Sequence, residues 1–416
     1  MGSTRRTRGG RLILRGAAVA VVGASALLAS PAVAATDAPT PTPTPSAAAT
    51  AGPGATAPAE PTVRVQAAEA DAYAERAAAI VAAMTPAQRA GTVVMGHIAS
   101  RDAETVRAYL ADASLGGFLL MGANVGWEEQ VRELTDAMVV DPALPPLIAV
   151  DQEGGSVSRL YWDRADAASA LRDESPGATE EAFAVRGALV ARAGIGVNFG
   201  VVADVTSDTR SFIWRRVLGE TPSDATSRVA AAVTAEEPYV LSALKHFPGH
   251  GAVVEDSHYT IPQTGLTLTQ WESRDARPFA AGVSAGAPLV MTGHLAYTAV
   301  DPLPASLSPQ WYRILREDLG FQGVAVTDDL GMLVQSRDPA YQDPVANAVA
   351  AISAGADLVL TVASSSSTTA PDMAAGIAAA VEAGTLDEAR LVEAAERVVA
   401  LRLQLAGDGR SFLPAE

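Results

Sequence analysis

Residues 241–250 read Leu-Ser-Ala-Leu-Lys-His-Phe-Pro-Gly-His, a short apolar run that ends in a group of ionisable side chains. The run Leu241–Leu244 has the length and composition of a buried strand. Lys245 is the only lysine of the chain, in which every other permanent cation is an arginine. Because an ammonium differs from a guanidinium in reach and hydration, a single lysine indicates a position that requires it. The stretch therefore predicts a strand that carries functional side chains at its carboxyl end.

Seven further apolar runs of this kind occur along the chain, and Ala-rich helical patterns such as 180–193 and 224–236 lie between most of them. The eight runs are Thr92–Met95, Gly117–Met121, Leu147–Val150, Val197–Val202, Leu241–Leu244, Leu289–Met291, Val324–Val326 and Asp357–Thr361. Apolar runs separated by helices are typical of parallel strands buried on both faces. Eight repeats predict an α/β fold, a single (β/α)₈ TIM-type barrel. A doubly wound open sheet is the alternative, although no Gly-x-Gly-x-x-Gly follows the first run to favour a dinucleotide-binding form.

Polar side chains follow seven of the eight runs. They are His97, Asn124, Asp151, Asp204, the pair Lys245-His246, His294 and Asp328. In a barrel these positions meet at one face, where active sites are built. Asn124 and Asp204 can equally begin turns or cap helices, so a structural role stays open for these two.

The first 34 residues have the pattern of a secretory signal peptide. Five arginines between positions 5 and 15 precede the apolar segment Gly16–Leu28 and the small-residue cleavage site Ala32-Val33-Ala34. We therefore expect a secreted or cell-envelope protein. An uncleaved membrane anchor is the alternative, and Arg5-Arg6 leaves twin-arginine export open.

Residues 35–64 are rich in Thr, Pro and Ala, a composition that predicts a disordered linker. Residues 65–416 are expected to form one catalytic domain. The chain has no cysteine, which excludes disulfides, a thiolate nucleophile and a lipid-modified cysteine. Its net charge of −17 argues against nucleic acid and anionic membrane surfaces as partners, so no stable membrane partner is expected after signal cleavage. Nothing in the sequence indicates the oligomeric state.

Two loops combine residues suited to acid–base chemistry. His246 and His250 are four residues apart, but Pro248-Gly249 between them breaks the helix that such a zinc site would need. Asp256 and His258 are two apart, so the carboxylate can hold one imidazole nitrogen and tune the other for general acid–base work. A purely structural histidine is the alternative.

Carboxylates follow two other runs. Asp328 comes directly after Val324–Val326, where a carboxylate serves as a nucleophile, a base or a metal ligand. The neighbouring Asp329 is expected to cap or orient. Asp151 begins the motif Asp-Gln-Glu-Gly-Gly, and its carboxylate can accept hydrogen bonds from sugar hydroxyls or bind a metal.

Five motifs together carry a resemblance to a known family. They are Asp151-Gln152-Glu153-Gly154-Gly155, Lys245-His246-Phe247-Pro248-Gly249-His250-Gly251, Asp256-Ser257-His258, Pro304-Ala305-Ser306-Leu307-Ser308 and Thr327-Asp328-Asp329-Leu330. In this order and spacing they resemble glycoside hydrolase family 3, in particular its β-N-acetylglucosaminidase branch. The resemblance extends from about Met84 to Ala406.

The resemblance implies a retaining exo-glycosidase, a β-N-acetylhexosaminidase that removes terminal non-reducing β-linked N-acetylglucosamine from cell-wall or chitin-type oligosaccharides. It implies Asp328 as the nucleophile and His258, paired with Asp256, as the acid/base. Neither a cofactor nor a metal is implied. The positions that match sugar-binding residues are Asp151, Arg159, Arg216, Lys245 and His246.

The sequence departs from the family pattern at Ser156, at Val217-Leu218 and at Gly293, which leaves the pocket shape and the leaving group open. Three other functions also stay open. The same residues would suit a phosphorylase, because a histidine does not repel phosphate as a second carboxylate would. A non-catalytic sugar-binding protein is another possibility. The third is a metal-dependent barrel hydrolase that uses His97, His246, His250 and Asp328.

Overall fold

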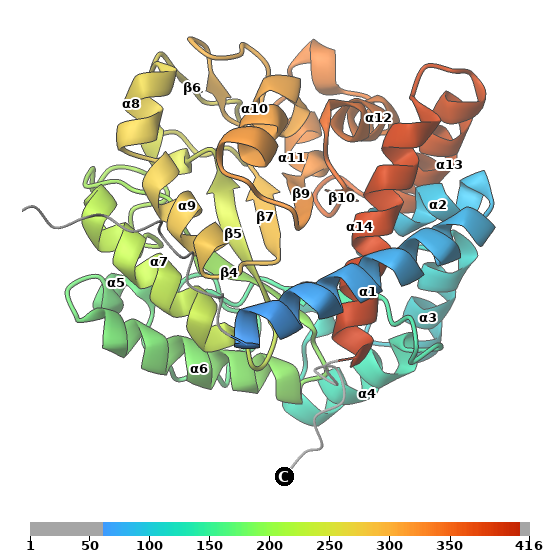
Figure 1. Cartoon of the computed structure of the whole chain (residues 1–416), viewed down its shortest axis with the longest axis horizontal. Helices are drawn as coiled ribbons and strands as arrows, with labels where there is room; N and C mark the ends of the chain where they lie inside the picture. The colour runs from blue at the N-terminus through green and yellow to red at the C-terminus, as the bar shows by residue number, and fades with distance from the viewer. Residues whose placement is uncertain (1–60, 408–416) are drawn as a thin grey trace, which may run out of the picture. The chain divides into compact units, whose positions relative to one another are not determined.

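The structure, a computed structural model, describes residues 61–407, and the predicted signal peptide lies outside the described residues. A central barrel of strands is surrounded by helices (Figure 1). Its eight parallel strands close in the order β1-β10-β9-β7-β5-β4-β3-β2. Their bounds are β1 Val94–Gly96, β2 Gly117–Leu120, β3 Leu147–Val150, β4 Val197–Val202, β5 Leu241–Phe247, β7 Leu289–Thr292, β9 Val324–Asp329 and β10 Leu358–Leu360. Each of the eight predicted runs supplies one strand. The predicted barrel is confirmed, and the open-sheet alternative is wrong because β1 pairs with β10.

Helices surround the barrel, and none of those described is long and apolar enough to cross a membrane. Their bounds are α1 Pro61–Ala83, α2 Pro86–Thr92, α3 Ala103–Asp112, α4 Glu128–Met138, α5 Ala168–Leu171, α6 Pro176–Arg192, α7 Pro222–Glu236, α8 Leu268–Ser273, α9 Ala276–Ser284, α10 Pro309–Arg313, α11 Leu330–Gln335, α12 Pro344–Ala354, α13 Thr369–Glu382 and α14 Glu388–Gly407. A small parallel pair, β6 (Gln263–Thr264) and β8 (Ala296–Tyr297), lies outside the barrel.

Two helix starts differ from the sequence expectation. The helices predicted over 180–193 and 224–236 begin earlier, because Ser175 and Thr221 cap their amino ends ahead of a proline, a favoured first helical residue. The helix α1 starts at Pro61, so the last four residues assigned to the linker are helical. The rest of the predicted linker lies outside the described residues.

The barrel interior is filled by apolar side chains that point inward from the strands, among them Met95, Leu119 and Phe199. Three side chains of α14 belong to the same cluster, Val398, Leu401 and Leu405. The cluster also contains the first residues of most strands, so α14 closes the amino-terminal end of the barrel. The carboxyl-terminal end of the barrel is therefore the end available for an active site.

Candidate active site

The predicted site residues meet at one cavity of about 450 Å³. It lies at the carboxyl ends of the strands, as a barrel enzyme requires. The predicted residues that line it are Asp151, Arg159, Arg216, Lys245, His246, His258 and Asp328. The eighth, Asp256, is not part of the lining and instead contacts His258.

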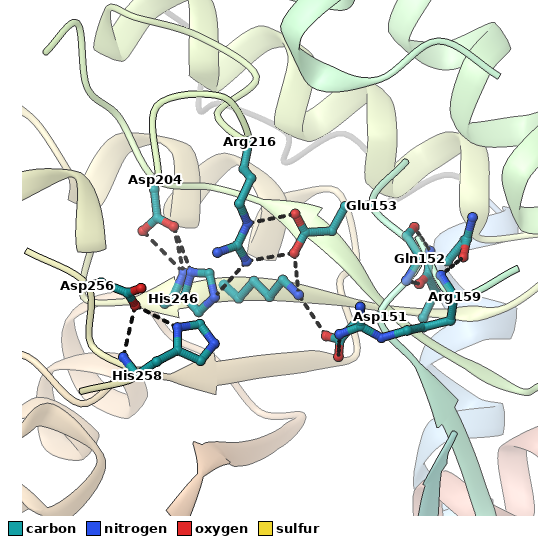
Figure 2. A network of polar contacts seen from close by, with 11 residues as sticks. Asp151, Gln152, Glu153, Arg159, Asp204, Arg216, His246, Asp256 and His258 are labelled. Atoms are coloured by element: carbon teal, nitrogen blue, oxygen red, sulfur yellow. Dashed lines mark hydrogen bonds and ion pairs between the residues drawn. The ribbon is translucent and has the colours of Figure 1, made fainter. Parts of the chain in front are cut away.

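Lys245 is the centre of a network of charges at this cavity, and Figure 2 shows the network members Asp151, Glu153 and Arg216. Its Nζ lies 2.9 Å from Oδ1 of Asp151 and 2.6 Å from Oε1 of Glu153. The guanidinium of Arg216 donates two hydrogen bonds to Glu153, at 2.8 and 2.7 Å, and Arg159 reaches Asp151 at 3.4 Å. A single ammonium thus joins two carboxylates of one loop, which is a physical reason for the only lysine of the chain.

The charges of this network stabilise one another. Burial alone would raise the pKa of Glu153, but the cations Arg216 and Lys245 lower it to about 2. Burial would lower the pKa of Lys245, and the carboxylates of Asp151 and Glu153 raise it instead. Glu153, Arg216 and Lys245 are therefore charged at neutral pH and form a fixed set of charges beside the cavity. Glu153 was not among the predicted site residues, and its position two residues after Asp151 was the available signal.

We expect Glu153→Gln to destabilise the protein by about 3–5 kcal/mol at neutral pH, because it removes the carboxylate that pairs with Arg216 and one of the two that pair with Lys245. The folded-state pKa lies below the ordinary 4.5, so the ionised carboxylate stabilises the fold above about pH 4.5 and this contribution is lost as the pH falls towards 2. Denaturant unfolding from pH 7 to pH 3 measures the effect. The difference in unfolding free energy between the wild type and Glu153→Gln should narrow as the pH falls. The control variant Glu104→Gln, at an exposed position, should show no such difference from the wild type.

His246 is oriented by Asp204 at the end of β4. Its Nδ1 lies 2.8 Å from Oδ2 of Asp204, whose carboxylate also accepts the backbone N–H groups of His246 and His250. Nε2 of His246 is 3.3 Å from Nη2 of Arg216. A guanidinium only donates, so Nε2 accepts and Nδ1 carries the proton. Asp204 is therefore a positioning residue rather than a simple cap.

The second imidazole, His258, is held on an exposed loop. Nδ1 of His258 lies 2.6 Å from Oδ1 of Asp256, which also accepts the backbone N–H of His258 at 3.0 Å. The predicted pairing of these residues is present in the structure (Figure 2). The ring of Phe212 meets the His258 ring edge-on at 5.4 Å. Nε2 of His258 has no hydrogen-bond partner among residues 61–407, and the residue lines the cavity.

Asp328 and Asp329 differ sharply in environment. Burial would raise the pKa of Asp328, but the nearby His246 and His294 and the N–H of Asp329 lower it to about 2. Burial raises the pKa of Asp329 to about 6. Asp329 accepts three backbone N–H groups, from Gly331, Val362 and Ala363, and so caps α11. Asp328 lines the cavity and stays ionised far below neutral pH.

Three other polar residues at strand ends hydrogen-bond to the fold itself. Asn124 bonds three backbone groups, and Nδ1 of His97 contacts the carbonyl of Leu119. Nε2 of His294 contacts the carbonyl of Asp329, so it donates, and Nδ1 accepts from Ser306. His97 and His250 do not line the cavity. Among residues 61–407, no three His, Asp or Glu side chains are placed to hold one metal ion, so the donor set of the metal-dependent alternative is not assembled.

A closed (β/α)₈ barrel whose mouth combines an ionised carboxylate, a carboxylate–histidine pair and a charged network has the arrangement expected of a glycoside hydrolase. The model of the glycosyl hydrolase family 3 N-terminal domain matches residues 87–401. The chain belongs to glycosyl hydrolase family 3.

Two curated relatives carry the name beta-hexosaminidase. That of Stenotrophomonas maltophilia is 36% identical over 237 residues, covering 54% of this chain and 70% of its own. That of Alkalilimnicola ehrlichii is 34% identical over 282 residues, covering 65% of this chain and 80% of its own.

Two solved structures share the fold. The family 3 beta-N-acetylglucosaminidase from Paenibacillus has a TM-score of 0.72 at 29% identity, and the match covers 78% of this chain and 63% of that chain. The beta-N-acetylhexosaminidase from Beutenbergia cavernae has a TM-score of 0.66 at 30% identity, covering 77% of this chain and 98% of that chain.

Proposed function

We propose that this family 3 glycoside hydrolase is a retaining exo-β-N-acetylhexosaminidase, which removes terminal non-reducing β-linked N-acetylglucosamine from cell-wall or chitin-type oligosaccharides. The observation that carries the proposal is the combination, around one cavity, of the ionised Asp328 with the His258–Asp256 pair. The names of the relatives support the choice of the amino sugar. With the predicted export signal, we propose that the reaction takes place outside the cytoplasm.

The reaction proposed for this site has two steps. In the first, a carboxylate oxygen of Asp328 attacks the anomeric carbon while Nε2–H of His258 protonates the departing glycosidic oxygen. In the second, His258 takes a proton from water, the water oxygen attacks the same carbon, and Asp328 leaves as a carboxylate. Asp256 holds Nδ1–H of His258 in both steps, which fixes the imidazole and balances its charge when it is protonated.

The terminal sugar is proposed to sit on the charged network below this pair. The carboxylate of Asp151 accepts from its hydroxyls, and Lys245 and Arg159 donate to them from their positions beside Asp151. His246 and Arg216 complete this wall. Because the network is anchored by buried ion pairs, it presents the sugar with donors and acceptors that are already oriented.

Turnover of an aryl β-N-acetylglucosaminide, with the matching β-glucoside as the control, tests the proposed function. We expect the glucosaminide to be hydrolysed with retained anomeric configuration and the glucoside to react much more slowly. Activity should be unchanged by exhaustive dialysis against a chelator. Inversion of configuration, or a requirement for a restored metal, would contradict the proposed mechanism. Formation of N-acetylglucosamine 1-phosphate at the expense of hydrolysis would identify a phosphorylase.

A further inference from the structure

Four permanent cations line the cavity, and three of them are already paired. Arg159, Arg216 and Lys245 each form an ion pair with a carboxylate of the loop that follows β3. Arg215 also lines the cavity, is exposed, and has no hydrogen bond or ion pair with any residue of the described range 61–407. Arg215 is therefore the cavity-lining cation whose charge no carboxylate of the described residues neutralises.

The position of Arg215 is tied to the proposed proton donor. Arg215 lies three residues after Phe212, whose ring touches both His258 and the guanidinium of Arg216. Arg216 is buried on the wall where it meets Glu153, whereas Arg215 is exposed. The same short loop therefore runs from the wall of the cavity to its mouth and passes the acid/base residue.

The position of His258, the proposed proton donor, also determines where the terminal sugar and the leaving group of a substrate lie. Nδ1 of His258 is occupied by Asp256, so Nε2 must face the glycosidic oxygen. The terminal sugar occupies the wall beside Asp151 and Lys245 on one side of that oxygen. The leaving group, and later the incoming acceptor, occupies the other side, towards the exposed mouth that carries Arg215.

We propose that Arg215 binds an oxyanion on the leaving-group side of the cavity. A guanidinium holds a carboxylate or phosphate through two parallel hydrogen bonds. The oxyanion is either a carboxylate on the sugar that leaves or inorganic phosphate that enters as the acceptor. In the second case a phosphate oxygen bonds to the anomeric carbon, Asp328 departs as a carboxylate, and the phosphate proton passes to His258.

A matched pair of substrates tests the carboxylate. The 4-carboxyphenyl and 4-carbamoylphenyl β-N-acetylglucosaminides have nearly the same shape, and only the first carries a charge. We expect the ratio of their kcat/KM values to favour the carboxylate and to fall on the order of tenfold in Arg215→Ala. Arg215→Lys should retain part of the preference, since it keeps the charge without the planar fork. Arg277→Ala, an exposed arginine on α9 outside the cavity, should leave the ratio unchanged, and added salt should reduce it.

Phosphate is tested with the carbamoylphenyl substrate at constant ionic strength, by measuring N-acetylglucosamine 1-phosphate in wild type and Arg215→Ala. A phosphate-dependent product lost in the variant would identify the acceptor as the bound oxyanion. An equal substrate ratio in both proteins, with no product that depends on Arg215, would overturn the proposal. The Arg215 proposal rests on the proposed hexosaminidase activity. If that activity is absent, the wild-type protein turns over neither aryl glucosaminide, which distinguishes this outcome from a failure of the Arg215 proposal alone.

Discussion

Asp328→Asn should lower turnover on the order of 10⁴-fold or more, as expected when a catalytic nucleophile is removed. Asparagine keeps the shape of the side chain and an oxygen that can accept the N–H of Asp329, now 2.8 Å from Oδ1. The fold should therefore be retained while the carboxylate that attacks carbon is lost. Steady-state rates, together with the thermal unfolding temperature, measure both parts of this expectation.

A slow fluorinated glycosyl donor provides the direct check. It should trap a glycosyl ester on Asp328, which peptide mass spectrometry locates. Asp208→Asn is a suitable control, because Asp208 is paired with Arg210 and does not line the cavity. A label on another residue, or near-normal rates in the asparagine variant, would show that Asp328 is not the nucleophile. The pKa of Asp328 is about 2, so it is ionised above about pH 3 and a loss of activity between pH 7 and pH 5 would belong to another group.

His258→Ala should lower the hydrolysis of natural disaccharides by roughly 10²- to 10⁴-fold, the contribution of a general acid–base group. Activated aryl glycosides should lose much less in the step that forms the glycosyl-enzyme, because a good leaving group needs little protonation. Pre-steady-state release of the phenol isolates that step. The ratio between the two substrate types is the quantity to measure.

Asp256→Ala should act in the same direction but more mildly, since Asp256 contacts only the far nitrogen of the imidazole, at 2.6 Å. The alternative is that His258 merely holds its loop against Phe212, from which it lies 5.4 Å ring to ring. In that case both substrate types would lose activity by the same factor, and the unfolding temperature would fall with it. Such equal losses would refute the acid/base role.

The barrel was predictable because its signal is repeated. Each of the eight runs is a nearly continuous apolar segment of the kind typical of a strand buried on both faces, and each formed a strand. Helix starts were less predictable, since capping by Ser175 or Thr221 lies ahead of the Ala-rich pattern. The pair β6 and β8 has only two residues in each strand, too few to show a period.

Site residues could be predicted where a residue type was unusual in the sequence. They were less predictable where their role depends on contacts formed only in the folded chain. Lys245 was visible as the only lysine, and the His258–Asp256 contact followed from their two-residue spacing. The roles of Glu153 and Asp204 depend on partners 63 and 42 residues away in sequence, which no local pattern shows. Sequence also gave no way to separate Asn124, a buried structural amide, from the functional residues at other strand ends.

The barrel can be completed only after the helix α14 has been synthesised. Its Val398, Leu401 and Leu405 fill the barrel floor, and β10, which closes the circle against β1, is itself one of the last elements. A growing chain therefore holds every proposed catalytic side chain before it holds a finished barrel. A polypeptide truncated before Glu388 would contain all the proposed catalytic residues, but it would lack the helix α14 that closes the amino-terminal end of the barrel. We expect such a product to be degraded rather than partly active, so nonsense mutations late in the gene should abolish function as fully as those within the catalytic motifs.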